Sequence, residues 1–167
     1  MVIDDIKKSK LETFKPLILI FLFISGVSVI AIVEGGQFNL MKWMNYFMAG
    51  FFITFSFFKF LDLRAFADSY SMYDLLAKRV RIYGFVYPFI ELAMGIAYLT
   101  HFAPNSTYIA TIAVMGFSSL GVIQSVLDKK KIKCACLGAV FNLPMTTVTI
   151  IEDLLMVAMA VLMLWTT

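Results

Sequence analysis

The chain has 167 residues, of which 61% are hydrophobic and 15% charged, and its mean hydropathy is +0.88. Soluble domains average about 45–50% apolar and about 25% charged residues. The apolar residues form long unbroken runs without the alternation of half-buried strands, which excludes a soluble domain, a disordered chain and an outer-membrane barrel. The composition therefore predicts an integral membrane protein built of helices.

Five apolar stretches are long enough to cross a hydrocarbon core, which takes about 20 residues. In chain order they cover approximately 16–33, 41–61, 82–100, 108–127 and 143–165. No repeat with a period of about 20–50 residues is present, so the stretches belong to one bundle and not to an array. We expect an all-α, polytopic membrane bundle of five transmembrane helices.

Basic residues gather on one side of this predicted bundle. The tail before the first stretch, the 59–81 region and the 128–141 loop hold every Lys and Arg except Lys42. Five spans place these three segments on one side, which the positive-inside rule makes cytoplasmic. The sequence thus predicts an N-terminus inside and a C-terminus outside. The net charge of +3 then faces the lipid bilayer surface, and nucleic acid is not an expected partner.

The segment 62–81 is too polar to span a membrane. Its apolar residues recur at spacings of three and four, as they do on one face of a helix: Phe66, Tyr70, Tyr73, Ala77 and Val80. The pattern favours an amphipathic helix at the membrane interface or against a partner. Packing of the same face against the other spans is equally compatible with it.

Charged side chains inside a predicted span are costly, so each one calls for an explanation. Glu91 and Glu152 both lie nine residues into their stretches, about 13 Å from the inner boundary at 1.5 Å per residue. Two helices thus bring carboxyl groups to one depth. Asp153 lies about 100° further round its helix, which places it off the face of Glu152. Lys59, near the inner end of its stretch, can extend outward, pair with Asp62 or lean inward to Glu91.

These intramembrane residues have two interpretations. Buried carboxyls can hold helices together by hydrogen bonding to Ser, Thr or Tyr. They can also handle protons, line a cation path or contact a cofactor such as a quinone. Pro88 frees a backbone carbonyl near Glu91, and Gly95 allows another helix to approach closely. Both features suit a cavity, and both suit tight packing.

The two cysteines form a C-x-C pair, Cys134 and Cys136. Such a pair can form a small-ring, easily exchanged disulfide, or it can bind a soft metal ion such as Cu(I). Nearby lysines favour the thiolate form that both chemistries need. A third interpretation is two small apolar residues in a loop. The charge pattern places the pair on the cytoplasmic side, where stable disulfides are rare, which leaves redox cycling or metal handling.

Three segments together resemble the MauE branch of the DoxX-like membrane proteins. They are Phe57–Asp62 with the following Ala65–Ala67, then Tyr87–Gly95, then the C-x-C-x-G of Cys134, Cys136 and Gly138. The resemblance implies a four-helix core over 41–167 in a bacterial inner membrane, preceded by an extra helix in 1–40. It also implies Cys134 and Cys136 as a redox pair and Lys59 and Glu91 as polar positions of the core.

The family role implied by this resemblance is thiol redox in the maturation of other proteins, traditionally of methylamine dehydrogenase. The chain differs from the family pattern in its additional N-terminal span and in Leu137, which stands where an aromatic is expected. Two other hypotheses remain. One is binding or transport of a soft heavy metal, copper or mercury, through the cysteine pair, as in small mercury- and copper-handling membrane proteins. The other is a non-catalytic membrane scaffold subunit. In the redox and scaffold hypotheses the partner is another protein.

Overall fold

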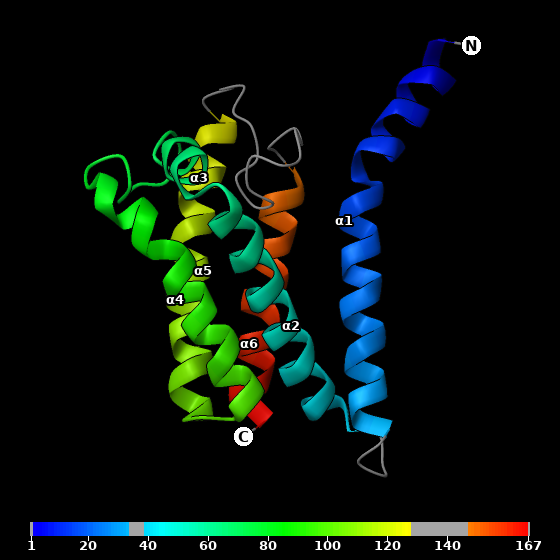
Figure 1. The fold of residues 1–167 in the computed structure, drawn as a ribbon, viewed down its shortest axis with the longest axis vertical. Coiled ribbons are helices and arrows are strands. Elements are labelled where there is room, and N and C mark those ends of the chain that lie inside the picture. Colours follow the sequence, from blue (N-terminus) through cyan, green and yellow to red (C-terminus); the bar gives the residue numbers. More distant parts are fainter. Residues whose placement is uncertain (1, 34–38, 128–146, 167) are drawn as a thin grey trace.

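The computed structural model describes residues 2–33, 39–127 and 147–166, and within these ranges all regular elements are helices (Figure 1). The cysteine pair and the predicted start of the fifth stretch lie outside the described residues. In chain order the helices are α1 Val2–Val33, α2 Leu40–Leu61, α3 Leu63–Tyr70, α4 Arg81–Thr100, α5 Pro104–Leu127 and α6 Thr147–Thr166.

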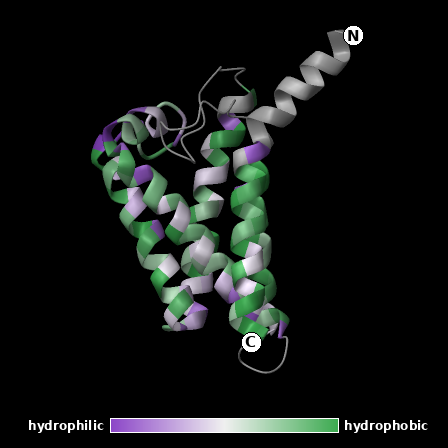
Figure 2. Cartoon of the chain, turned by 45° about the vertical axis from the view of Figure 1, so that its right-hand side comes forward, coloured by the Kyte–Doolittle hydropathy of each residue, from purple (hydrophilic) through white to green (hydrophobic). Residues whose placement is uncertain are grey.

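Three described helices are long and apolar enough to cross a membrane, namely Leu40–Leu61, Arg81–Thr100 and Pro104–Gln124, and Leu17–Val33 is a shorter apolar helix. Hydrophobic residues run along the helices, whereas hydrophilic ones gather around α3 and its neighbouring turns (Figure 2). The predicted all-helical, membrane-type bundle is therefore confirmed. The number of five spans and their orientation stay predictions.

Local sequence signals define where several helices begin and end. The Asn39 side chain accepts hydrogen bonds from the backbone N–H groups of Met41 (2.8 Å) and Lys42 (3.3 Å), which caps α2. Asp62 ends α2 and caps α3 by accepting from the Ala65 N–H at 3.0 Å. Pro104 opens α5, where a missing N–H costs nothing. The cap of α2 agrees with the predicted start at 41 to within one residue, whereas α5 begins four residues before the predicted start at 108.

Helices α2, α4, α5 and α6 form two closely packed pairs, α2 with α4 and α5 with α6. Gly95 permits the first pairing, because a Cβ atom there would lie 2.8 Å from Ile53 Cγ1 and 3.1 Å from Ile53 N. Large side chains are buried in the core of the bundle, among them Met48, Phe52, Phe55, Met115, Met156 and Met163. The result is a close-packed four-helix core.

The segment 62–81 differs from the predicted continuous helix. Only Leu63–Tyr70 is helical, and turns follow up to the start of α4. The turn is stabilised by Asp74, whose Oδ1 accepts from the N–H groups of Leu76 and Ala77 at 2.9 and 2.8 Å. Four of the five residues in the apolar pattern are buried against the bundle, while Val80 is 48% exposed. The apolar spacing therefore reflects packing on the other spans.

Helix α1 contacts the bundle chiefly through α2 (Figure 1). The Phe21 ring lies 6.0, 5.7 and 6.2 Å from the rings of Phe47, Phe51 and Phe55. Large apolar side chains on its other faces are exposed, among them Leu19, Leu22, Phe23, Ile30 and Val33. A helix with this surface suits contact with lipid.

Candidate functional site

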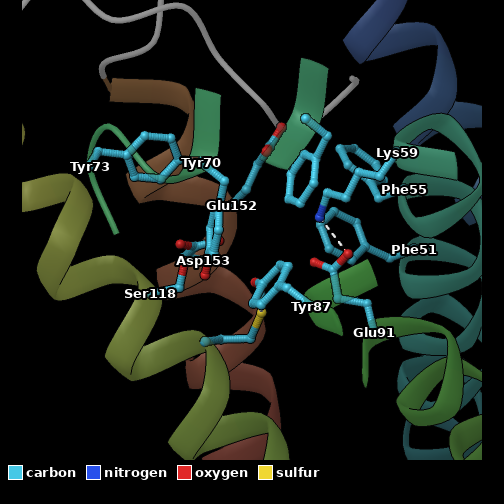
Figure 3. Close-up of a pocket in the computed structure, with 12 residues that line it drawn as sticks. Phe51, Phe55, Lys59, Tyr70, Tyr73, Tyr87, Glu91, Ser118, Glu152 and Asp153 are labelled. Atoms are coloured by element: carbon cyan, nitrogen blue, oxygen red, sulfur yellow. Dashed lines mark hydrogen bonds and ion pairs between the residues drawn. The ribbon is translucent and has the colours of Figure 1, made fainter. Parts of the chain in front are cut away.

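A small polar cavity lies inside the bundle near its α3 end (Figure 3). Its volume is about 20 Å³, and five helices and the turn after α3 contribute to its lining. The polar and charged residues of the lining are Lys59, Tyr70, Tyr73, Tyr87, Glu91, Ser118, Glu152 and Asp153. All four intramembrane residues predicted from the sequence therefore border one cavity.

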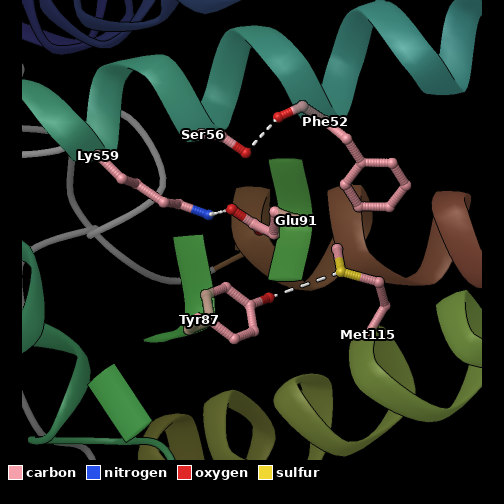
Figure 4. A network of polar contacts seen from close by, with 6 residues as sticks. All are labelled: Phe52, Ser56, Lys59, Tyr87, Glu91 and Met115. Atoms are coloured by element: carbon pink, nitrogen blue, oxygen red, sulfur yellow. Dashed lines mark hydrogen bonds and ion pairs between the residues drawn. The ribbon is translucent and has the colours of Figure 1, made fainter. Parts of the chain in front are cut away.

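Lys59 reaches inward and pairs with Glu91. Its Nζ donates a hydrogen bond to Glu91 Oε2 from α2 to α4 (Figure 4). The two residues are 4% and 2% exposed. The ammonium group also lies 5.3 Å from the Phe66 ring centre and 4.9 Å from that of Tyr87, which adds cation–π attraction. Asp62 caps α3 instead of pairing with Lys59. Of the three arrangements predicted for Lys59, the structure shows the one in which it leans inward to Glu91.

Glu152 and Asp153 project from α6 to the same cavity and are 5% and 6% exposed. The sequence argument separated them because consecutive helical residues point about 100° apart. In the structure both side chains nevertheless line the cavity. The direction midway between them on α6 points to the cavity, so each side chain reaches a different side of it. No described group of His, Cys, Asp and Glu side chains is arranged to hold a metal ion.

Tyrosine rings line the α3 side of the cavity. The Tyr70 ring lies 4.6 Å from that of Tyr87 and 5.2 Å from that of Tyr73. The Tyr87 hydroxyl donates to Met115 Sδ at 3.6 Å (Figure 4). Burial, and then the negative charge of Asp74, raise the pKa of the Tyr70 hydroxyl well above its ordinary value. At physiological pH Tyr70 is therefore a neutral hydrogen-bond donor.

Sequence reasoning missed Tyr87 and Ser118 as members of this site. Tyr87 precedes Glu91 by one helical turn, so its spacing could have placed it on the same face. Nothing in the sequence distinguishes Ser118 from the other hydroxyl residues of its stretch. Tyr70 and Tyr73 were noted only for their place in the apolar pattern. The cavity draws on residues that are far apart in the chain.

A second, larger space opens beside the first. It is an apolar groove of about 430 Å³ between α1, α2 and α6, lined by Leu17, Ile18, Phe21, Leu22, Ser25, Phe47, Ile151 and Glu152. Glu152 borders both spaces and is the only charged residue among the described residues that line the groove. The polar cavity and the groove thus meet at one carboxyl group.

The chain carrying Cys134 and Cys136 lies outside the described residues, but its flanking helices are described. Helix α5 ends and α6 begins at the end of the bundle where α3 lies (Figure 1).

A buried ion pair and two further carboxyl groups inside an apolar helical bundle define the class of this protein. It is an integral membrane protein of the multi-pass helical type that keeps ionisable side chains within its core. Residues 37–166 match the family described as "Methylamine utilisation protein MauE", and the chain belongs to this family. The resemblance noted in the sequence is thereby confirmed. The match begins after α1.

Comparisons with curated proteins and with solved structures find no match to this chain.

Proposed function

We propose that this MauE family member is a five-span protein of a bacterial inner membrane that takes part in thiol–disulfide exchange for the maturation of other proteins. The redox pair is Cys134 and Cys136. The observation that carries the proposal is the family match over 37–166, which includes the C-x-C pair and the polar positions Lys59 and Glu91.

The proposed exchange is a transfer of two electrons between two pairs of sulfur atoms. The thiolate of one cysteine attacks a disulfide of the partner protein, which forms a mixed disulfide and releases one partner thiolate. The thiolate of the other cysteine then attacks the first, which closes the Cys134–Cys136 disulfide and releases the second partner thiolate. The partner is reduced and the C-x-C pair is oxidised. A small-ring disulfide is easily exchanged again, so a dithiol of the cytoplasm can reduce the pair by the same two-electron exchange and is itself oxidised to a disulfide.

The proposed orientation has the N-terminus and the cysteine pair in the cytoplasm and the C-terminus outside. The distribution of Lys and Arg supports it, because every one except Lys42 belongs to segments on a single side. The exposed apolar surface of α1 supports its assignment as an additional span. Helix α6, with 20 residues, reaches about 30 Å at 1.5 Å per residue, the thickness of a hydrocarbon core.

Labelling of the cysteines tests the proposed side and the redox cycle together. A membrane-impermeant maleimide is applied to intact and to permeabilised cells, with and without prior reduction, with a Cys134→Ser/Cys136→Ser chain as the blank. We expect labelling only after permeabilisation, and a signal that grows on reduction. Labelling of intact cells would overturn the orientation and restore an outward-facing disulfide-forming role.

Trapping of the partner tests the exchange reaction itself. In Cys134→Ser or Cys136→Ser, one cysteine attacks the partner but no second thiolate resolves the mixed disulfide. We expect one of the two single variants to accumulate a covalent, reductant-sensitive complex that the double variant lacks. If neither does, and reduction leaves labelling unchanged, thiol exchange is wrong.

Soft-metal binding is the competing outcome of these experiments. Stoichiometric copper binding to the purified protein, lost in the double cysteine variant and maintained against a weak chelator, would support it. A double variant without any phenotype in cells would instead support a non-catalytic scaffold.

A further inference from the structure

The turn after α3 carries large apolar side chains that are not packed against the bundle. They are Met72, Leu76, Val80 and the neighbouring Ile82, which are 57%, 39%, 48% and 71% exposed. The Leu76 carbonyl accepts a hydrogen bond from the Val80 N–H at 2.8 Å. These two side chains therefore lie one turn apart on the same side of the segment. Exposed apolar surface of this kind is unfavourable in water and favours an apolar neighbour.

Positive charges lie among these apolar side chains. The basic residues of the segment 62–82 are all exposed: Arg64, Lys78, Arg79 and Arg81. Of its acidic residues, Asp74 is fully buried. Asp62 caps α3, and Asp68 pairs with Arg81. The outer face of the segment is therefore both apolar and net positive.

The two helices that flank this segment determine its depth in a membrane. Helix α2 has 22 residues and α4 has 20. At 1.5 Å per residue they are about 33 and 30 Å long, which matches a hydrocarbon core of about 30 Å. Helix α3 and its turn join the end of α2 to the start of α4 at one end of the bundle (Figure 1). Two helices that cross the bilayer place the segment between them at the level of the lipid headgroups.

An anionic phospholipid matches both properties of this face. Apolar side chains at headgroup level enter the boundary between headgroups and acyl chains. Lys and Arg are attracted to anionic headgroups, and their long apolar stems let the charge reach a phosphate while the backbone stays at the boundary. A zwitterionic lipid would satisfy the apolar side chains but not the cations.

We propose that the outer face of residues 72–82 is a binding surface for anionic phospholipid. Its exposed apolar side chains lie against the upper part of the acyl chains, and Lys78 and Arg79 bind headgroup phosphates. The inner side of the same segment carries Tyr73, which lines the polar cavity. Bound lipid therefore stabilises a segment that also encloses the cavity. This surface goes beyond thiol exchange and does not involve the cysteines.

A fluorescent reporter on this face tests the proposal. The full-length chain with Met72→Cys, in the Cys134→Ser/Cys136→Ser background, is labelled at position 72 and placed in nanodiscs of phosphatidylcholine with increasing phosphatidylglycerol. Quenching by iodide in the water is compared with quenching by a nitroxide on the lipid acyl chain. We expect phosphatidylglycerol to decrease the first and increase the second, and high salt to reverse part of the change.

Two variants that each remove one exposed cation separate this surface from the rest of the protein. Arg79→Gln should raise the fraction of phosphatidylglycerol at half-change about fivefold, which corresponds to the roughly 1 kcal/mol that one cation contributes near an anionic surface. Lys42→Gln is the matched control. Lys42 is exposed near the start of α2, at the opposite end of that helix, so its replacement should leave the half-change unaltered.

The labelled chain can overturn the proposal without any charge variant. A label that iodide quenches equally in both membranes would lie in water, as on a face that an acidic protein covers, and anionic lipid would be the wrong partner. An equal response to pure phosphatidylcholine, or an Arg79→Gln chain that responds like Lys42→Gln, would show that the cations do not bind lipid. Since the labelled chain lacks Cys134 and Cys136, failure of thiol exchange leaves this result unaffected.

Discussion

The two ends of the bundle differ in the polar groups that they bury. At the α3 end, charged groups are buried around a cavity. At the other end, neutral side chains connect the helices: Tyr98 and Thr111 share a hydrogen bond of 2.9 Å, and Tyr108 donates to Asn45 at 3.3 Å. All four of these residues are buried.

The neutral end shows what helix packing by itself requires. Hydrogen bonds between uncharged side chains hold the same helices together without removing a charge from water. Burying an ion pair carries a desolvation cost of several kcal/mol per ion that its attraction only repays in good geometry. Packing of the helices by itself therefore does not require the charged groups at the α3 end. Three sets of variants test this difference between the ends.

The largest effect is expected at the ion pair. Lys59→Met removes the ammonium group from the cavity and leaves Glu91 without its partner, which should cost about 3–5 kcal/mol in the free energy of unfolding. Adding Glu91→Leu should recover most of this loss, because an apolar pair of similar size replaces the ion pair. Unfolding in mixed detergent micelles measures both.

A surface ion pair is the control for that experiment. Arg81 and Asp68 pair with side chains that are 69% and 53% exposed, so Asp68→Asn should cost no more than about 1 kcal/mol. If the double variant at Lys59 and Glu91 were as unstable as the single one, the pair would be needed for packing, and the comparison of the two ends would be wrong.

An intermediate effect is expected where glycines let backbones approach. A Cβ atom at Gly121 would lie 2.8 Å from the Tyr73 carbonyl oxygen and 3.1 Å from Asp74 Cα, both backbone atoms. Gly121→Ala should therefore cost about 1–3 kcal/mol by overpacking. At Gly95 a Cβ atom would lie 2.8 Å from Ile53 Cγ1 and 3.1 Å from Ile53 N, so Gly95→Ala should cost a similar amount.

Gly116 is the matched control, because no atom lies within 4 Å of a Cβ atom built there. Gly116→Ala should stabilise the helix by up to about 1 kcal/mol, since alanine favours helix more than glycine does. Thermal unfolding of the three variants in one detergent ranks them. Equal losses at Gly121 and Gly116 would contradict the close packing of the turn after α3 against α5.

The smallest effect is expected at the neutral end. Tyr98→Phe removes one hydrogen bond, and Thr111 keeps its bond to the Thr107 carbonyl at 2.9 Å, so nothing buried loses its last partner. The loss should be about 0.6 kcal/mol, the average for hydrogen bonds between membrane helices. A double-mutant cycle with Thr111→Val measures the coupling, and a coupling as large as that of Lys59 with Glu91 would remove the distinction between the ends.

The sequence by itself determined the class of the protein and the bounds of α2 and α4. Predicted stretches at 41–61 and 82–100 agree with α2 and α4 to within one residue. The physical reason is local, because in lipid a chain must satisfy its backbone hydrogen bonds within the segment, and Asn39 and Asp62 mark the helix starts. Glu91 and Glu152, to which the sequence assigned one depth from the rise per residue, line the same cavity.

Only the tertiary structure decided which side chains meet. The sequence allowed Lys59 three positions, and the close packing of α2 on α4 selected Glu91, 32 residues away. The sequence argument placed Glu152 and Asp153 on different faces of their helix. In the structure α6 is oriented so that both side chains line the cavity. The turn after α3 could not be predicted, because the apolar residues of 62–81 have the spacing of a helix. These outcomes depend on how the helices are rotated about their axes and how closely they approach one another. Side-chain packing between helices sets both, and the periodicity of a single helix contains no information on either.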